Sequence, residues 1–311
     1  MEKINRFFRL HTYKRLFTKL LSPFVKLKTI NDPILFMTLY VRDEEDIIED
    51  NLKFHHAMGI DGFIVTDNGS KDSTLEILRK YERLGWIKEI IINPSTNHPQ
   101  DICVDKMIRL AKNKYHADWI INADADEFWW SPLKNLKKAL EEYHKSNIVF
   151  VNLFNVLPED GKNRKDWDKM VFSPIKNWEQ EGLSKYSLYA PNIPKVIHRT
   201  EFYRKIFRGN HQVQMLFEKK CIASNIFIYH YPIRSYSHFE RKVIRGGIAY
   251  SNNSNKNLGI HWRYWYSLYL QGQLLDEYKK TVSIEHFDDF LSKNVLGTDK
   301  AYLDFVKDIV E

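Results

Sequence analysis

The sequence predicts an α/β fold in which helices cover a mostly parallel sheet. Short apolar runs rich in β-branched residues alternate with segments in which apolar residues recur every three or four positions. This alternation is typical of parallel sheets, because neighbouring parallel strands need a long crossover that is usually a helix. Polar residues follow two of the predicted strands at their carboxyl ends, where open α/β sheets bind their ligands. We therefore expect a ligand site at that edge of the sheet.

The predicted elements follow one another in regular order through the first half of the chain. Strands are expected over 33–41, 61–66, 86–92, 118–123 and 147–154. Four helices are expected between them: one that carries Ile48, Leu52 and His55, one that carries Leu75, Ile77, Leu78 and Tyr81, one near 101–114 and one over 132–144. The tail 275–311 has the pattern of short helices. We divide the chain into a basic arm (1–30), a main domain (31–270, with halves 31–155 and 156–270) and a C-terminal helical extension (271–311).

Two aspartates, Asp124 and Asp126, follow the apolar strand 118–123 directly. In an extended strand, residues two apart point to the same face, so both carboxylates can address one ligand. Mg²⁺ and Mn²⁺ prefer oxygen ligands, and one or two carboxylates suffice when substrate phosphates fill the other positions. A second copy of the pattern, Asp166-Trp-Asp168, lies in a polar run with no strand before it. The context of the first copy favours a metal site, with a solvated turn or a helix cap as the alternative.

The second predicted strand leads through a tight turn into a capped helix. Gly69 permits the sharp turn, and Ser70 and Asp72 suit the N-terminal cap of the helix. A cap alone explains those residues but gives no reason for Asp67 and Asn68 at the end of the strand. The turn is therefore expected to contact a ligand.

Local motifs of several other enzyme classes are missing from the sequence. No Gly-x-Gly-x-x-Gly follows the first predicted strand, and there is no Walker-type phosphate loop, no Gly-x-Ser-x-Gly and no His-Glu-x-x-His. These absences argue against a dinucleotide-binding domain, a P-loop nucleotidase, a serine hydrolase and a zincin.

Three motifs in succession resemble those of a known family. They read Val-Arg-Asp-Glu-Glu (41–45), Val-Thr-Asp-Asn-Gly-Ser (65–70) and Ile-Asn-Ala-Asp-Ala-Asp-Glu-Phe-Trp (121–129). They are similar to the motifs of GT-A-fold glycosyltransferases of the family-two type, and further matches extend the resemblance from residue 33 to about residue 270. The resemblance implies a nucleotide-diphosphate sugar as donor, foremost a UDP- or GDP-sugar. It also implies a divalent Mn²⁺ or Mg²⁺ and inversion at the anomeric carbon.

The resemblance also implies roles for individual residues. Asp67 would hold the nucleotide base, Asp124 would face the ribose and the metal, and Asp126 would bind the metal that bridges the phosphates. His230 ends an apolar strand and is expected as the third metal ligand, with a core histidine as the alternative. The expected donor-binding residues are Arg42, Asp43, Asp67, Asn68, Ser70, Asp72, Asp124 and Arg234.

An inverting transfer needs a general base for the acceptor hydroxyl. His211 is the first candidate, because Gly209-Asn210-His211 reads as a tight turn presenting an imidazole, whose ordinary pKa is near 6.5. A turn histidine bonded to backbone is the alternative, and Glu181 is the second candidate base. Trp129 and Trp130 are expected to contact a saccharide acceptor, since an indole offers a flat apolar face and one N–H donor.

Positive charge is concentrated at the N-terminus. The chain has 47 Lys and Arg against 40 Asp and Glu, a net +7, but residues 1–30 hold eight of the bases and one acid, Glu2. The rest is formally neutral, 39 against 39, which removes the main support for binding of nucleic acid. An amphipathic pattern over Leu10–Leu21 fits an interfacial helix, so residues 1–28 are expected to contact an anionic membrane surface. A helix packed on the main domain or a disordered tail is the alternative.

The expected location is the cytoplasm, peripherally at the inner face of a membrane if the arm binds one. No apolar run reaches the roughly 20 residues that span a bilayer, and the arm lacks the pattern of a signal peptide. Cys103 and Cys221 alone suggest no disulfide framework. We expect transfer to saccharide or lipid-linked acceptors in cell-surface glycan assembly. The open alternatives are a metal-dependent sugar nucleotidyltransferase and a carbohydrate-binding protein without turnover.

Overall fold

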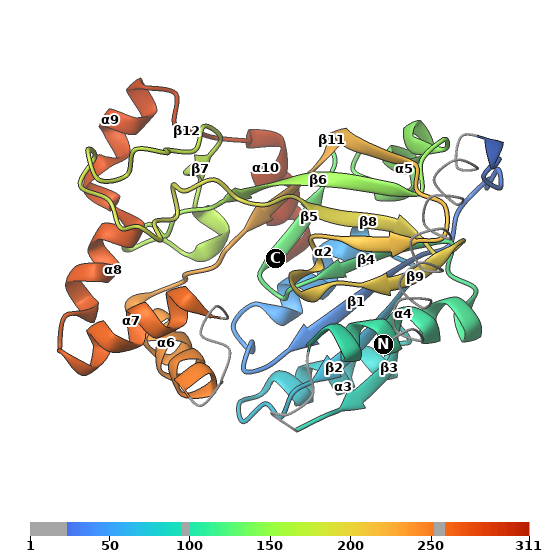
Figure 1. Cartoon of the computed structure of the whole chain (residues 1–311), viewed down its shortest axis with the longest axis horizontal. Coiled ribbons are helices and arrows are strands. Elements are labelled where there is room, and N and C mark those ends of the chain that lie inside the picture. Colours follow the sequence, from blue (N-terminus) through green and yellow to red (C-terminus); the bar gives the residue numbers. More distant parts are fainter. Residues whose placement is uncertain (1–23, 95–99, 252–258, 311) are drawn as a thin grey trace, which may run out of the picture. The chain divides into compact units, whose positions relative to one another are not determined.

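The computed structural model describes residues 24–94, 100–251 and 259–310, which form two compact units (Figure 1). The described residues within Met1–Ala125, Trp130–Asn152 and Pro194–Phe227 form the first unit, and those within Asp126–Trp129, Leu153–Ile193 and Ile228–Glu311 form the second. The chain thus passes between the units several times. The predicted boundary at residue 155 lies close to one of these passages, but a later stretch returns to the first unit because its strands complete the sheet there.

Parallel strands form the centre of the first unit. β1 (Leu35–Val41) pairs in parallel with β2 (Gly62–Asp67) and with β4 (Trp119–Ala123), and β2 pairs in parallel with β3 (Ile87–Ile92). β8 (Lys195–Arg199) then adds to β4 in the antiparallel direction and carries β6 (Ile148–Asn155) on its other side. The full strand order is β3-β2-β1-β4-β8-β6-β11-β5, with β11 spanning Lys220–His230 and β5 spanning Glu127–Trp130.

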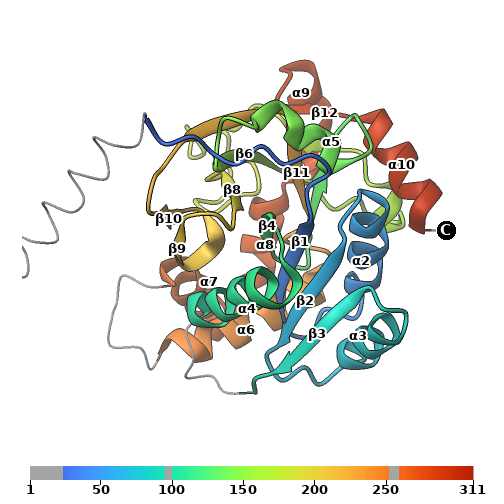
Figure 2. The same cartoon turned by 90° about the vertical axis from the view of Figure 1, so that its right-hand side faces the viewer.

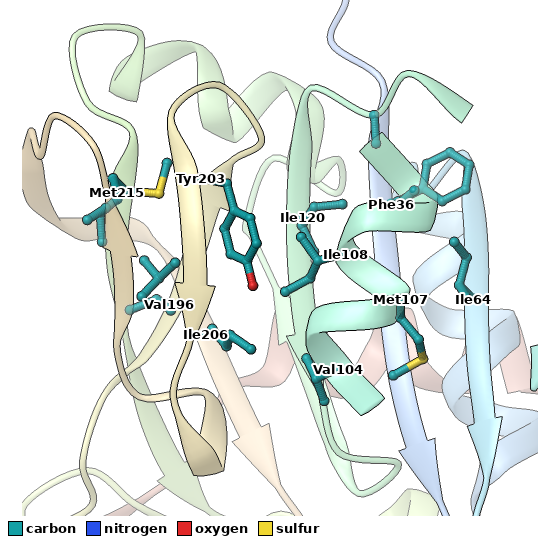
Figure 3. Packing of buried hydrophobic residues seen from close by; sticks show 14 residues of the cluster. Phe36, Ile64, Val104, Met107, Ile108, Ile120, Val196, Tyr203, Ile206 and Met215 are labelled. Atoms are coloured by element: carbon teal, nitrogen blue, oxygen red, sulfur yellow. The ribbon is translucent and has the colours of Figure 1, made fainter. Parts of the chain in front are cut away.

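Helices cover both faces of the parallel strands. Figure 2 shows α4 (Gln100–Tyr115) on one side of these strands and α2 (Ile48–Ala57) and α3 (Thr74–Arg83) on the other. The buried face of α4 carries Val104, Met107 and Ile108, which pack on strand residues such as Phe36 and Ile120 (Figure 3). A hairpin of β9 (Tyr203–Ile206) and β10 (Val213–Met215) extends the same cluster. Full burial of each such side chain stabilises the fold by about 1.5–3 kcal/mol.

The second unit is mainly helical. Its elements are α6 (Tyr236–Ser251), α7 (Ile260–Leu270), α8 (Leu274–Val282), α9 (Phe287–Ser292), α10 (Lys300–Val310) and a small sheet of β7 (Met170–Val171) with β12 (Leu296–Gly297). Two glycines let α6 and α7 approach closely. A Cβ on Gly246 would lie 2.6 Å from the Trp262 ring, and one on Gly247 would lie 2.1 Å from the Tyr266 ring. A side chain at either position would therefore push the helices apart.

The predicted fold class, an α/β sheet flanked by helices with further helices toward the C-terminus, is confirmed, while its assignment to the GT-A type stays a prediction. Two details differ from the prediction. The pairs among β1, β2, β3 and β4 are parallel, whereas β8 pairs in the antiparallel direction with both β4 and β6. The helix expected over 132–144 is shorter: α5 covers Leu136–Leu140, and Glu141–Tyr143 form a 3-10 turn. None of the helices in the described ranges is long and apolar enough to cross a membrane.

Candidate active site

Asp124, Ala125 and Asp126 form a short turn between two strands. β4 ends at Ala123 and β5 begins at Glu127. The sequence pattern predicted that the two aspartates extend the strand, but they lie in the turn that follows it. Hydrogen bonds hold the turn by its backbone. Asn51 Nδ2 donates to the Ala125 carbonyl at 2.9 Å, and the Tyr231 N–H donates to the Asp126 carbonyl at 2.8 Å. The conformation of this turn therefore depends on residues that are distant in the sequence.

His55 orients the Asn51 amide. His55 Nδ1 donates to the Asn51 carbonyl at 2.8 Å and lies 3.0 Å from Asn51 Oδ1, which leaves the amide nitrogen to face Ala125. Burial lowers the pKa of His55 to about 3, so the imidazole is neutral at physiological pH. Both side chains are fully buried.

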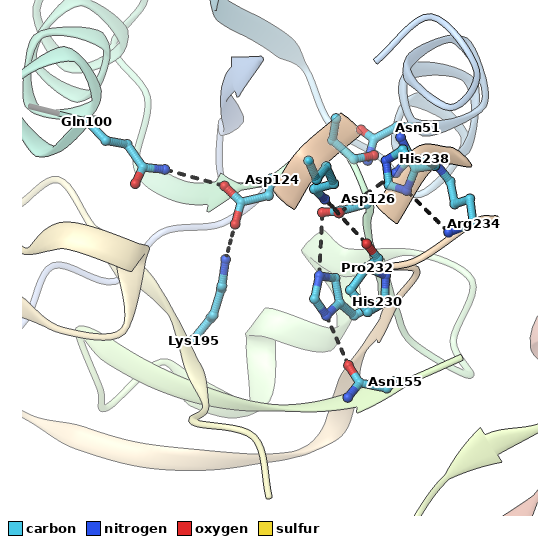
Figure 4. Close-up of polar contacts among 12 residues, drawn as sticks. Asn51, Gln100, Asp124, Asp126, Asn155, Lys195, His230, Pro232, Arg234 and His238 are labelled. Atoms are coloured by element: carbon cyan, nitrogen blue, oxygen red, sulfur yellow. Dashed lines mark hydrogen bonds and ion pairs between the residues drawn. The ribbon is translucent and has the colours of Figure 1, made fainter. Parts of the chain in front are cut away.

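Asp124 forms an ion pair in the first unit. Lys195 Nζ lies 2.7 Å from Asp124 Oδ2, and Gln100 Nε2 lies 3.5 Å from Oδ1 (Figure 4). The Lys195 side chain is only 5% exposed, whereas that of Asp124 is 37% exposed. Sequence reasoning missed Lys195, because it lies 71 positions from Asp124 and only the pairing of β4 with β8 brings the two together.

Asp126 lies beside two cationic side chains and a histidine in the second unit. Its Oδ2 lies 3.1 Å from Lys242 Nζ and 3.8 Å from Arg234 Nη1, and its Oδ1 lies 3.5 Å from His230 Nε2 (Figure 4). Burial pushes the pKa of Asp126 upward, but Lys242, His230 and Arg234 together hold it well below its ordinary value. The nearby His238 stays neutral, because burial and the charges of Arg234 and Lys242 lower its pKa to about 2. Asp126 is therefore a buried carboxylate that stays ionised.

The Asp126–His230 pair fits a divalent cation. Two ligands held about 2.1 Å from one cation at a right angle lie about 3 Å apart, close to the 3.5 Å between Asp126 Oδ1 and His230 Nε2. Mg²⁺ commonly takes few protein ligands and completes its shell with phosphate and water. Among the described residues, no three His, Cys, Asp or Glu side chains gather as a metal site, so the predicted set of Asp124, Asp126 and His230 is not seen as one cluster.

Asp67 organises the turn that follows β2. It is 1% exposed, and its Oδ2 accepts hydrogen bonds from the backbone N–H groups of Gly69 at 3.1 Å and Ser70 at 3.2 Å. Ser70 Oγ donates to its other oxygen. Asn68 differs, because its buried Oδ1 has no hydrogen-bond partner among the described residues. A ligand that donates a hydrogen bond would satisfy this atom.

Two further carboxylates tie the β2–α3 turn to the β1–α2 loop. Asp43 Oδ1 accepts from the Lys71 N–H at 2.8 Å, and Asp72 Oδ2 accepts from the Glu45 N–H at 3.1 Å. Arg42 Nε lies 3.7 Å from Asp43 Oδ2. These residues have clear roles within the protein, and their predicted contacts with the donor stay predictions.

The two candidate bases have different surroundings. His211 Nδ1 donates to the Pro194 carbonyl at 3.1 Å, so a neutral imidazole carries its lone pair on Nε2. Gly209 adopts a φ of 77° beside it, and a Cβ there would lie 2.8 Å from the His211 ring. Glu181 lies in the second unit, where Lys293 Nζ is 3.5 Å from its Oε2 and both side chains are partly exposed. The bond to Pro194 is what the alternative, a turn histidine bonded to backbone, describes, so the roles of His211 and Glu181 as base stay predictions.

The expected acceptor contacts of Trp129 and Trp130 are wrong. Both side chains are 0% exposed, so neither indole presents a face to a sugar. Trp130 instead packs near Phe54, with ring centroids 6.4 Å apart. The aromatic residues of this strand belong to the hydrophobic core.

The family of the chain follows from a comparison with protein-family models. The model of glycosyltransferase family 92 matches residues 37–267, which is most of the chain. The chain belongs to glycosyltransferase family 92. It is therefore a glycosyltransferase, as the motifs predicted, while the predicted likeness to a family-two subgroup stays a prediction. No curated protein matches the sequence.

Solved structures of other glycosyltransferases resemble this family 92 chain. TarS 1-349 of S. aureus in complex with UDP-GlcNAc is 12% identical with a TM-score of 0.43, and the match covers 83% of this chain and 75% of that one. The mannosyltransferase PcManGT of Pyrobaculum calidifontis, in complex with GDP-Man and Mn²⁺, is 11% identical with a TM-score of 0.42, over 85% and 80% of the two chains. At these values the likenesses do not bear on the substrate.

Proposed function

We propose that this family 92 enzyme transfers a sugar from a UDP- or GDP-sugar to a hydroxyl of a saccharide or lipid-linked acceptor, with inversion and with Mn²⁺ or Mg²⁺. The observation that carries the proposal is the buried, ionised Asp126 facing His230 at 3.5 Å. A departing nucleoside diphosphate is an anion, so its departure needs positive charge held in a preorganised place. Asp126 holds two cationic side chains, Lys242 and Arg234, in one place.

Asp126 and His230 would hold the divalent cation, which when bound neutralises the diphosphate and acts as a Lewis acid on it. Lys242 and Arg234 lie beside the same carboxylate, on Oδ2 rather than on the oxygen that faces His230. They add fixed positive charge for the leaving group. A fixed charge in a buried place stabilises a developing anion more than it would in water.

His211 is the proposed base of the reaction. The acceptor oxygen bonds to the anomeric carbon on the face opposite the diphosphate, the bond from that carbon to the phosphate oxygen breaks, and the acceptor proton passes to His211 Nε2. The Pro194 carbonyl supports this role, because it accepts from Nδ1–H and so keeps the lone pair on Nε2. We expect His211→Gln to lower kcat by about 10²–10⁴-fold. Glu181→Gln is the matched control and should keep its kcat. A loss of this size in Glu181→Gln, with kcat unchanged in His211→Gln, would identify Glu181 as the base.

The nucleotide is proposed to lie at the carboxyl ends of β1, β2 and β4, in contact with the predicted donor-binding residues. Asn68 supports this placement, because its buried amide oxygen has no hydrogen-bond partner among the described residues. The Asp124–Lys195 pair places one negative and one positive side chain next to the end of β4.

A thermal-shift screen with UDP, GDP and their sugars, with and without Mn²⁺, tests the proposal. A ligand at 100 times its dissociation constant stabilises the native state by about 2.7 kcal/mol. We expect one diphosphate to stabilise the wild type only with metal, and Asp126→Asn to lose this response. Turnover should release a nucleoside diphosphate; release of pyrophosphate would identify a nucleotidyltransferase instead. Absence of any nucleotide response would favour a carbohydrate-binding protein.

We also propose that the enzyme works in the cytoplasm on cell-surface glycans, and that residues 1–28 contact an anionic membrane. The support is the concentration of positive charge in this arm; residues 1–23 lie outside the described part of the structure. Sedimentation with vesicles of phosphatidylserine and phosphatidylcholine, compared with vesicles of phosphatidylcholine alone, measures the contact. A variant with the arm's Lys and Arg changed to Gln should stay in the supernatant in both cases.

A further inference from the structure

Asn155 lies behind His230 in the second unit and is almost fully buried, with 5% of its surface exposed. It is the last residue of β6, and His230 is the last residue of β11. Asn155 Oδ1 is 3.0 Å from His230 Nδ1, and Asn155 Nδ2 donates to the Leu188 carbonyl at 2.7 Å. Figure 4 shows Asn155 on the side of the imidazole opposite Asp126.

The Leu188 contact decides which atom of the amide faces the imidazole. A carbonyl oxygen only accepts hydrogen bonds, so the NH₂ group of Asn155 must point to Leu188 and its oxygen to His230. An amide oxygen also only accepts, so His230 Nδ1 must carry the hydrogen. In the neutral imidazole the lone pair then lies on Nε2, the nitrogen that faces Asp126 Oδ1.

We propose that Asn155 is a positioning residue that fixes the Nδ1–H tautomer and the ring orientation of His230, so that Nε2 is ready to bind a divalent cation beside Asp126. This inference rests on the proposed function, because it takes Asp126 and His230 as the metal pair. Histidines that bind metals commonly donate their second ring N–H to an outer partner, which makes the ring a better ligand. Here that partner is a neutral amide held by backbone.

The strands do not need Asn155 in order to stay together. The Val156 N–H donates to the His230 carbonyl at 2.8 Å, so the backbones of the two strand ends are already bonded. Apolar side chains surround the nearby Leu188 in the core of this unit. A leucine at position 155 would suit such surroundings, whereas an asparagine there adds a directed hydrogen bond to His230.

Titration of the metal-free enzyme with Mn²⁺, followed by calorimetry and by the loss of the free-ion EPR signal, tests the inference without turnover. Asn155→Leu is expected to bind Mn²⁺ about 10–100-fold more weakly, as for other outer partners of metal ligands. Asn155→Asp keeps an acceptor for Nδ1–H and should recover most of the affinity. Asn152→Ala, an exposed amide on the same strand, is the matched control and should bind as the wild type does.

Nitrogen NMR of the imidazoles reads the tautomer directly and needs no metal. The His230 signals, assigned by their loss in His230→Ala, should show hydrogen on Nδ1 in the wild type and a shift toward Nε2–H in Asn155→Leu. A folded Asn155→Leu variant that keeps both the wild-type tautomer and the wild-type Mn²⁺ affinity would overturn the role of Asn155 but leave the proposed metal site standing. A wild type that binds no Mn²⁺, with or without UDP or GDP, would overturn the proposed metal site itself.

Discussion

Two sets of carboxylates, one in each unit, differ in the groups that surround them. In the first unit, Asp67, Asp43 and Asp72 accept hydrogen bonds from backbone N–H groups of two loops. In the second unit, Asp126 lies beside the side-chain cations Lys242 and Arg234 instead. An amide donor adds no net charge, whereas Lys242 and Arg234 do. The first arrangement therefore fixes the conformation of the two loops, and the second places positive charge around the Asp126 carboxylate.

The sharpest test of this difference is Asp126→Asn. The change keeps the size of the side chain but removes the negative charge that holds Lys242, Arg234 and His230 together. We expect kcat to fall by about 10²–10³-fold, as when a charge-stabilising group is removed from an active site. Steady-state kinetics with the donor found by the thermal-shift screen give the number. Activity within a few-fold of wild type would show that the two sets of carboxylates do not differ in function.

Sequence patterns predicted the features that depend on neighbours along the chain. The succession of strands and helices in the first half followed from periodicity, and the tight turn after β2 followed from its glycine and polar residues. His230 beside Asp126 is not such a feature, because it was expected only from the resemblance and from its place at a strand end. The partners of Asp124 and His230 were not predicted, because Lys195 and Asn155 are 71 and 75 positions away from them. Such partners are selected by strand pairing, which no local pattern encodes.

The error at Trp129 and Trp130 has a related physical cause. An aromatic run after an aspartate pair fits both a ligand platform and a buried strand, and only the packing of neighbouring elements decides between them. β5 lies at the end of the sheet order, yet all four of its residues are buried. Burial of an edge strand depends on what covers it, which the strand's own sequence does not specify.

Asp67→Asn should affect stability rather than the chemical step. Asparagine keeps one acceptor, but it loses the charge and one of the oxygens that bind Gly69, Ser70 and the Ser70 hydroxyl. Hydrogen bonds to charged groups contribute about 1.5–3 kcal/mol, so we expect a loss of that order in the free energy of unfolding. Urea denaturation measures it. A stable variant with strongly reduced nucleotide affinity would show that Asp67 acts through its proposed contact with the base and not by holding the turn.

Buried histidines of the first unit should make stability depend on pH. Burial lowers the pKa of His55 to about 3 and that of His198 to about 4, against about 6.5 in the unfolded chain. The unfolded state therefore binds more protons than the folded state, and the free energy of unfolding falls as pH drops below 6.5. Each histidine should cost about 2 kcal/mol between pH 6.5 and pH 5. His198→Gln should flatten this slope in urea titrations at several pH values.

Asp126 works in a different pH window, which separates the two effects. Its folded pKa lies well below the ordinary value, so its contribution to stability is complete above about pH 4 and is lost only as pH falls further. A decline between pH 6.5 and pH 5 that persists unchanged in His198→Gln and in a matching His55→Gln variant would contradict the assignment to these two histidines.

The smallest effect is expected at the second copy of the aspartate pair, Asp166-Trp-Asp168. Asp166 Oδ1 lies 3.0 Å from Lys307 Nζ, and both side chains are more than two-fifths exposed. Exposed ion pairs contribute about 0–1 kcal/mol, so Asp166→Asn should change the free energy of unfolding by no more than that and leave kcat and Mn²⁺ binding unchanged. Asp166→Asn and Asp126→Asn alter the same motif by the same chemistry, and they differ in the surroundings of the carboxylate. Loss of metal-dependent nucleotide binding in Asp166→Asn would show that those surroundings do not determine which copy is functional.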